Sequence, residues 1–261
     1  MARIYGPDTA KALQIINDWI AAGDTHADLV FNKLKLTRLP PLPPNLEKLN
    51  VTNVHIKEIT ELPPGIRSIH VCFTSLERIC VLPPSLTAVT LNFSKLKVLP
   101  APLPPNLEVL YCVDSQISSI PPLPSTLVGI SVHSNNRLKE LPALQQCRIV
   151  WLNIYNTPIQ LVPTLPESLQ SIYAEKCPNL MIEMKNPNTI DFYRAQWAEL
   201  YNRNRFLSKM RILKEDLMAA AWHPRKVWTW IKAGRFVGLS QYGEEEHDYS
   251  VLNMMAGYES D

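Results

Sequence analysis

Apolar residues in the middle of the chain recur in one order that repeats about every 20 residues. Each copy opens on a leucine or isoleucine and places further apolar residues three, five and ten or eleven positions later. This alternation predicts a short β-strand, because Leu49 and Val51 would face inward and Asn50 outward. A partial copy over 29–36 precedes the first full one. The seven openings are Leu46, Ile66, Leu86, Leu107, Leu127, Ile149 and Leu169.

Proline clusters separate the copies, as in Leu-Pro-Pro-Leu-Pro-Pro at 39–44 and Leu-Pro-Pro at 62–64 and 82–84. After a strand of about four residues and two turns, about ten residues of each copy remain for the return path. Proline breaks helices, so that return should be extended or polyproline II. A single copy cannot offset the entropy of ordering its own backbone. The copies must therefore stack, and the ends of the stack need caps.

The order of apolar residues matches the leucine-rich repeat pattern L-x-x-L-x-L-x-x-N-x-L. We therefore predict an α/β repeat fold over residues 29–182: a short-period leucine-rich repeat solenoid with a parallel β-sheet on its concave face and an extended, polyproline II convex side. The asparagine of the pattern occurs only at Asn135. Hydroxyl side chains at the equivalent positions can take over part of its hydrogen bonding. We therefore expect a less regular ladder than the consensus forms.

Two segments resemble the proline-rich repeats of bacterial type III secreted effectors. They are Leu-Pro-Pro-Leu-Pro-Pro-Asn-Leu-Glu-Lys-Leu-Asn-Val at 39–51 and Leu-Pro-Pro-Asn-Leu-Glu-Val-Leu at 103–110. Some of those effectors carry a C-terminal ubiquitin-ligase domain with a catalytic cysteine. The last cysteine of this chain is Cys177, inside the repeats, so the resemblance does not extend to that activity. We therefore expect that this protein is not an enzyme.

Helical patterns flank the repeats. Residues 1–28 predict an N-terminal cap, formed by one helix that ends at Gly23 and carries Leu13, Ile16 and Ile20 on one face, with Trp19 beside them. After the repeats, a helical extension over 186–235 is predicted to begin with a helix at 191–210. Residues 236–261 form an acidic tail without Lys or Arg, either solvated or clamped onto the basic helices.

Residues 213–234 resemble a Trp-His-Pro segment found near the ends of many proteins of nucleocytoplasmic large DNA viruses. The matching stretch runs Leu-Lys-Glu-Asp-Leu-Met, then Trp-His-Pro-Arg-Lys-Val, then Trp-Ile and Gly. The resemblance implies a viral origin. From the residues alone, Trp222, Trp228 and Trp230 either pack together as a small helical knob or contact a partner.

Composition narrows the function classes. The chain has 261 residues, of which 46% are apolar, 23 are proline and 8 are glycine, so neither disorder nor collagen fits. A net charge of +2 gives no reason to expect nucleic acid. Five cysteines without a Cys-x-x-Cys pair favour a reducing, intracellular compartment, and no apolar run approaches membrane-spanning length. His70 and His133 lie three repeats apart, too far to share a metal, and we expect no cofactor or small-molecule substrate.

Outward positions of the predicted strands are rich in aromatic residues and poor in charge, a composition typical of protein-binding surfaces. Tyr111, Trp151 and Tyr155 are the stronger candidates, because Phe73 and Phe93 have the alternative of folding over the strand edge into the core. The predicted partner-binding residues are His70, Phe73, Phe93, Tyr111, His133, Trp151, Tyr155, Tyr173, Trp222, Trp228 and Trp230.

These observations favour a non-catalytic protein–protein interaction scaffold. Our first hypothesis is a virion or capsid-associated component of a large DNA virus, with capsid proteins among the partners of its concave sheet and C-terminal helices. The alternative is a soluble adaptor in the host cytoplasm, whose repeats select a target while the C-terminal helices recruit host machinery. An enzyme would need a nucleophile or a metal site that the sequence does not supply.

Overall fold

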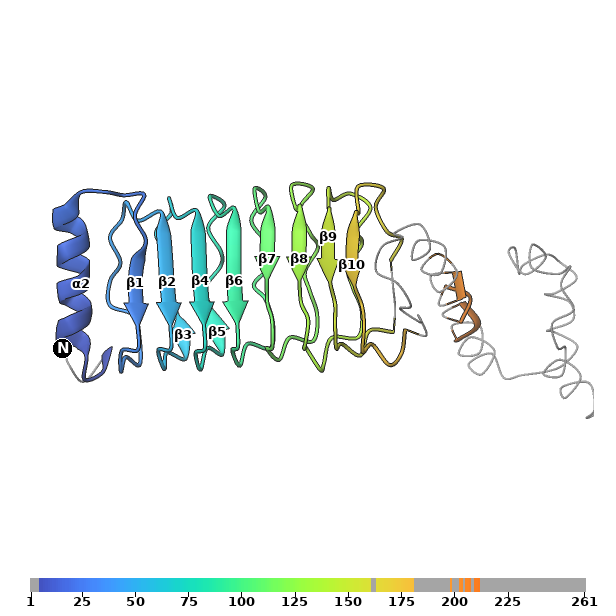
Figure 1. Cartoon of the computed structure of the whole chain (residues 1–261), viewed down its shortest axis with the longest axis horizontal. Helices are drawn as coiled ribbons and strands as arrows, with labels where there is room; N and C mark the ends of the chain where they lie inside the picture. Colours follow the sequence, from blue (N-terminus) through green and yellow to red (C-terminus); the bar gives the residue numbers. More distant parts are fainter. Residues whose placement is uncertain are drawn as a thin grey trace, which may run out of the picture. The chain divides into compact units, whose positions relative to one another are not determined.

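The computed structural model describes residues 5–160, 163–180, 198, 202–203, 205–207 and 209–211. Helix α2 (Thr9–Ala22) precedes ten short strands that follow one another along one axis (Figure 1). The strands are β1 (Leu29–Asn32), β2 (Lys48–Thr52), β3 (Glu58–Ile59), β4 (Ser68–Cys72), β5 (Arg78–Ile79), β6 (Ala88–Asn92), β7 (Val109–Tyr111), β8 (Gly129–Ser131), β9 (Trp151–Asn153) and β10 (Ser171–Tyr173).

Eight strands form one parallel sheet in the order β1-β2-β4-β6-β7-β8-β9-β10, while β3 and β5 pair on the return path. Leu49 pairs with Ile69, Ile69 pairs with Val89, and the same row continues to Ile172. The predicted leucine-rich repeat solenoid is confirmed. The strands pair in one register throughout the sheet, and they shorten to three residues from β7 onward. The expectation of a less regular ladder than the consensus forms stays a prediction.

The core lies between the sheet and the return path. The first six opening residues, from Leu46 to Ile149, have no exposed surface, and Leu169 is 1% exposed. Burying a side chain of this size contributes about 1.5–3 kcal/mol. Each turn of the solenoid gains this burial only when its neighbours cover it, which is why the copies stack.

Two kinds of turn join each strand to the return path. Before β2, the Pro43 carbonyl accepts a hydrogen bond from Leu46 N at 3.2 Å. Pro44 thereby occupies the second position of a β-turn, where its fixed φ fits. After each strand of the large sheet, one residue has a positive φ between 49° and 58°, and none of the eight is glycine. These residues are Lys33, Asn53, Phe73, Phe93, Asp114, Ser134, Asn156 and Lys176.

The internal asparagine position is buried and hydrogen-bonded. Asn135 has no exposed surface, and its Nδ2 donates to the carbonyls of Cys112 and Val132, both at 2.7 Å. One repeat later, the Thr157 hydroxyl donates to the Ile154 carbonyl at 2.7 Å. The Thr157 hydroxyl thus bonds one carbonyl where Asn135 bonds two.

Helix α2 packs against β1 at the N-terminal end of the solenoid. Its buried side includes Ile16 and Trp19, whose Nε1 donates to the Ala27 carbonyl at 3.1 Å. Leu13 and Ile20 are 37% and 55% exposed, so the expected grouping of these two with Ile16 was wrong. The buried face runs instead through Thr9, Ala12, Ile16 and Trp19.

At the other end, the described residues between 198 and 211 are helical, in line with the helix expected at 191–210. The remainder of the predicted extension, the acidic tail, and Trp222, Trp228 and Trp230 lie outside the described residues.

Candidate protein-binding surface

The outward side chains of the eight-stranded sheet form one surface, which we name the strand face. Inward side chains are buried in every strand, so only outward positions can meet solvent. From β4 to β10 none of the outward residues is Asp, Glu, Lys or Arg. These residues are Ser68, His70, Cys72, Ala88, Thr90, Asn92, Val109, Tyr111, Gly129, Ser131, Trp151, Asn153, Ser171 and Tyr173.

Tyr111 and Trp151 form an aromatic platform above β8. Their ring centroids are 5.3 Å apart and their planes are inclined by 31°, although β8 separates the strands that carry them. Trp151 pairs in register with Gly129, where a Cβ atom would lie only 2.0 Å from the indole Cε2. Glycine therefore allows the indole to lie over β8 and meet Tyr111, which stays 37% exposed.

Phe73 and Phe93 stack on each other just beyond the ends of β4 and β6. Their ring centroids are 4.3 Å apart with an interplanar angle of 6°. They are 54% and 40% exposed, so the alternative in which they fold into the core is wrong. Both have a left-handed backbone, with φ of 53° and 51°, a conformation that costs of order 1 kcal/mol or more for a bulky residue. We name these two residues the phenylalanine pair.

A third aromatic group joins His133, Tyr155 and Lys176. The His133 and Tyr155 rings meet edge to face at 6.3 Å, and Lys176 Nζ lies 5.3 Å from the Tyr155 centroid, within cation–π range. Partial burial lowers the pKa of His133, and the nearby Asp114 carboxylate only partly opposes this. Hydrogen bonding with Tyr155 raises the pKa of Lys176. Near pH 7 this group therefore holds a neutral imidazole and a charged ammonium.

The structure thus assembles six of the predicted residues into three ring pairs. Sequence reasoning missed Lys176 and Gly129 as parts of these groups. The available signal was the repeat period, which places each residue beside its equivalent one turn away. His70 is exposed on β4, and Tyr173 is 49% exposed on β10, apart from the ring pairs. Partner binding by all of these residues stays a prediction.

All five cysteines of the chain lie among the described residues and are free. Burial raises the pKa of the Cys112 thiol to about 12, which keeps it protonated. The described part of the chain holds no group of three or more His, Cys, Asp or Glu side chains placed to bind a metal. None of its helices is both long enough and apolar enough to cross a membrane.

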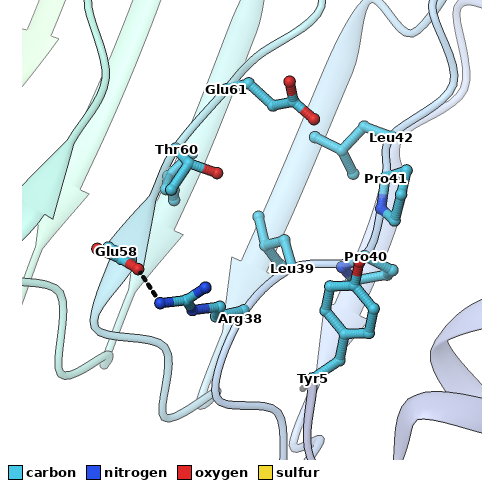
Figure 2. A pocket seen from close by; sticks show the side chains of 10 residues that line it. Tyr5, Arg38, Leu39, Pro40, Pro41, Leu42, Glu58, Thr60 and Glu61 are labelled. Carbon is cyan, nitrogen blue, oxygen red and sulfur yellow. Dashed lines mark ion pairs between the residues drawn. The ribbon is translucent and has the colours of Figure 1, made fainter. Parts of the chain in front are cut away.

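A cavity of about 160 Å³ lies on the return path of the first repeats, between Tyr5 and the turn that carries β3 (Figure 2). At its edge Glu58 accepts from Arg38 at 2.8 Å, and its other oxygen accepts from Arg78 at 2.8 Å (Figure 2 shows the first pair). Pockets that bind small molecules usually measure about 300–1,000 Å³. We assign this cavity no ligand because of its size.

Comparison with known proteins finds solved structures with the same fold. No family model matches the chain, and no curated protein matches it. Among solved structures, the leucine-rich repeat domain of a Shigella effector is 26% identical, with a TM-score of 0.52 over 59% of this chain and 68% of that one.

Two structures of YopM, a leucine-rich effector protein, are also similar. YopM from Yersinia enterocolitica WA-314 is 31% identical, with a TM-score of 0.44 over 57% of this chain, which spans only 37% of that protein. YopM from Yersinia pestis is 24% identical, with a TM-score of 0.45 over 62% of this chain and 58% of that one. The chain thus shares the leucine-rich repeat solenoid fold with the Shigella effector domain, a fold that serves as a protein-interaction scaffold.

Proposed function

We propose that this protein is a non-catalytic scaffold that binds protein partners through the strand face. The observation that carries the proposal is the aromatic platform, two rings brought together over a glycine on a face without formal charge. Tyrosine and tryptophan are the residues most often found at the energetic centres of interfaces, because they bury a large area at a low cost in side-chain entropy.

The other two aromatic groups extend the footprint. The phenylalanine pair lies beyond β4 and β6, and the group of Tyr155 and Lys176 lies beyond β9 and β10. Strands are spaced about 4.8 Å apart, so the five steps from β4 to β10 span about 24 Å. A face of that length suits a protein surface or an extended segment better than a small molecule.

Affinity purification with a double variant, Tyr111→Ala with Trp151→Ala, tests the proposal. We expect the partner proteins captured by the wild type to be lost, while the melting temperature falls by only a few degrees, since Tyr111 is exposed and Trp151 half-buried. The matched control is Val81→Ala with Val98→Ala, which changes residues that are 68% and 61% exposed outside the strand face. Equal capture by both double variants would refute the proposal.

We also propose a setting for this activity, a virion or capsid-associated role in a large DNA virus. The support is the resemblance of residues 213–234 to the viral Trp-His-Pro segment. Quantitative mass spectrometry of purified particles tests it, and absence of the protein from the particles would contradict it. The second candidate is an adaptor in the host cell. The similarity to a Shigella effector domain favours that setting, and detection in host cytoplasm but not in particles would support it.

A further inference from the structure

We propose that the turns after the strands of the large sheet bind anionic lipid bilayers, with lysines on the headgroups and the phenylalanine pair inserted between them. All eight strands are parallel, so these turns lie along one side of the solenoid (Figure 1). We name this side the basic rim. It consists of residues 33–38, 53–58, 73–78, 93–98, 114–119, 134–140, 156–160 and 176–180. The inference goes beyond the proposed function, because it concerns a second surface.

Positive charge is concentrated on the basic rim. Its turns hold ten Lys or Arg residues against four Asp or Glu residues. The turns at the opposite ends of the strands hold two against three, over 43–47, 63–67, 83–87, 104–108, 124–128, 145–150 and 166–170. The four acids of the rim are Glu58, Glu77, Asp114 and Glu140. Its bases are Lys33, Lys35, Arg38, Lys57, Arg78, Lys95, Lys97, Arg137, Lys139 and Lys176. The net charge of the whole chain does not show this asymmetry.

Many of these bases have no acidic partner in the part of the chain that the structure describes. Glu58 pairs with Arg38 and Arg78, and the other described ion pairs lie outside the rim. Exposed bases that form no ion pair with a described residue include Lys57, Lys95, Lys97, Arg137 and Lys139. Hydrogen bonds between turns fix their spacing: Ser118 N, for example, donates to the Lys97 carbonyl at 3.2 Å. The rim thus presents an ordered array of positive charge.

The phenylalanine pair adds an apolar contact on the same rim. Phe73 and Phe93 are the first residues of two neighbouring turns, and both are exposed. Lys95 follows Phe93 by two residues, so a ring and an ammonium group belong to one turn. Strained backbone of the kind found at both phenylalanines is most often retained at functional sites. Phenylalanine beside lysine is typical of surfaces that lie in the bilayer interface. On this inference the pair contacts lipid, and the protein footprint is centred on the aromatic platform.

Residue types favour a bilayer over other polyanions. Seven of the ten bases are lysine, and Glu58 already pairs with two of the three arginines. Lysine is depleted from protein–protein interfaces, where arginine binds carboxylates through paired hydrogen bonds. Single-stranded nucleic acid stacks its bases on open aromatic faces. The two phenylalanine rings cover each other at 4.3 Å, so no base fits between them. An anionic bilayer attracts lysines without a fixed pairing geometry and also takes up the rings.

Vesicle flotation with the full chain tests the proposal. We expect binding to phosphatidylcholine vesicles that contain about 30% phosphatidylserine, and much weaker binding to phosphatidylcholine alone. The affinity should fall about tenfold or more between about 0.1 and 0.5 M NaCl, because salt screens exposed charges. Equal affinity for the two kinds of vesicle would overturn the proposal. Binding to a single-stranded oligonucleotide without binding to the anionic vesicles would overturn it as well.

Charge variants locate the contact on the rim. Each lysine near an anionic surface strengthens binding about fivefold, so Lys95→Glu with Lys97→Glu should weaken vesicle binding about 25-fold or more. Arg67→Glu with Arg148→Glu makes the same change of net charge at the opposite ends of the strands, and it should bind nearly as the wild type does. An equal loss in both double variants, or no loss in the first, would overturn the proposal.

A second pair of substitutions tests the rings. Phe73→Asn with Phe93→Asn should weaken vesicle binding about tenfold or more, because two apolar side chains no longer enter the interface. The turns should keep their conformation, since Asn53 and Asn156 occupy the equivalent left-handed positions. Circular dichroism checks the fold. Wild-type affinity in the folded double variant would overturn the proposal.

The outcomes also separate this inference from the proposed function. Tyr111→Ala with Trp151→Ala should leave vesicle binding unchanged, and Lys95→Glu with Lys97→Glu should leave protein capture unchanged. If the wild type fails to bind anionic vesicles while the variant at Tyr111 and Trp151 loses its protein partners, the lipid inference is wrong and the scaffold function stands. If vesicles bind and that variant keeps its partners, the scaffold function is wrong and the lipid inference stands.

Discussion

Asn135 offers the most direct measurement of what holds the solenoid together. Its Nδ2 donates to two backbone carbonyls at 2.7 Å, one on its own turn and one on the preceding turn, at Val132 and Cys112. The residue is fully buried, so no water can replace these bonds. Asn135→Ala removes two bonds of about 0.5–1.5 kcal/mol each and leaves two buried carbonyls unpaired. We expect the free energy of unfolding to fall by about 2–4 kcal/mol.

Asn135→Asp tests the cause, since it keeps the shape and replaces the donor with an acceptor. An ionised carboxylate would face two carbonyls, so folding should raise the pKa of the new acid above about 3.9. A protonated carboxyl has one O–H and can donate to only one of the two carbonyls. The loss of stability relative to the wild type should therefore be smallest below that pH and grow as the pH rises to 7.

Urea unfolding followed by circular dichroism measures these differences. The control is Asn106→Ala, an exposed asparagine whose Nδ2 lies 3.4 Å from the Pro84 carbonyl, and we expect a change within about 0.5 kcal/mol. A loss below about 1 kcal/mol in Asn135→Ala, or a pH-independent loss in Asn135→Asp, would refute the reasoning.

Two further predictions concern the return path and the thiols. The guanidinium of Arg78, together with Arg38, lowers the pKa of Glu58 below 4.5. The ionised Glu58 carboxylate therefore stabilises the folded protein above pH 4.5. This contribution is lost as the pH falls through the lower pKa of Glu58 in the folded state. The urea midpoint of Glu58→Gln should be below that of the wild type at pH 6, and the two should converge in acid; a constant gap would contradict this. Iodoacetamide at pH 8 should modify half-buried Cys80 before fully buried Cys112, as peptide mass spectrometry of the folded protein will show; the opposite order would contradict the burial.

Periodicity alone predicts most of the fold. The spacing of Leu46, Ile66 and Leu86 places each of them in the core, because a one-dimensional stack repeats the environment of each position. The buried face of the N-terminal helix was harder to predict. Leu13 and Ile20 fit the helical period of an apolar face just as well as the residues that are in fact buried. The buried face runs through Ala12, Ile16 and Trp19, and it is set by how the helix packs against β1, which the helical period alone does not specify.

The sequence predicts which residues line the candidate surface, because equivalent positions of successive repeats form rows across the sheet. It does not predict which of these residues contact one another. Tyr111 and Trp151 stand in different rows on strands that are not neighbours, and their meeting depends on the glycine between them. A pattern search treats Gly129 as a weak strand residue, whereas in three dimensions it provides the space for the indole. The cation–π contact of Lys176 likewise depends on a side-chain path that spacing does not specify.

The single register of the sheet has an evolutionary consequence. Every strand pairs only with its neighbours and every repeat contributes the same set of core residues, so recombination can add or delete one whole repeat without a new core having to be invented. Such an event between β6 and β7 would move the phenylalanine pair relative to the aromatic platform by one strand, about 4.8 Å. Descendants of this gene would then differ in the spacing of their binding residues while folding equally well, and partner choice would change in discrete steps.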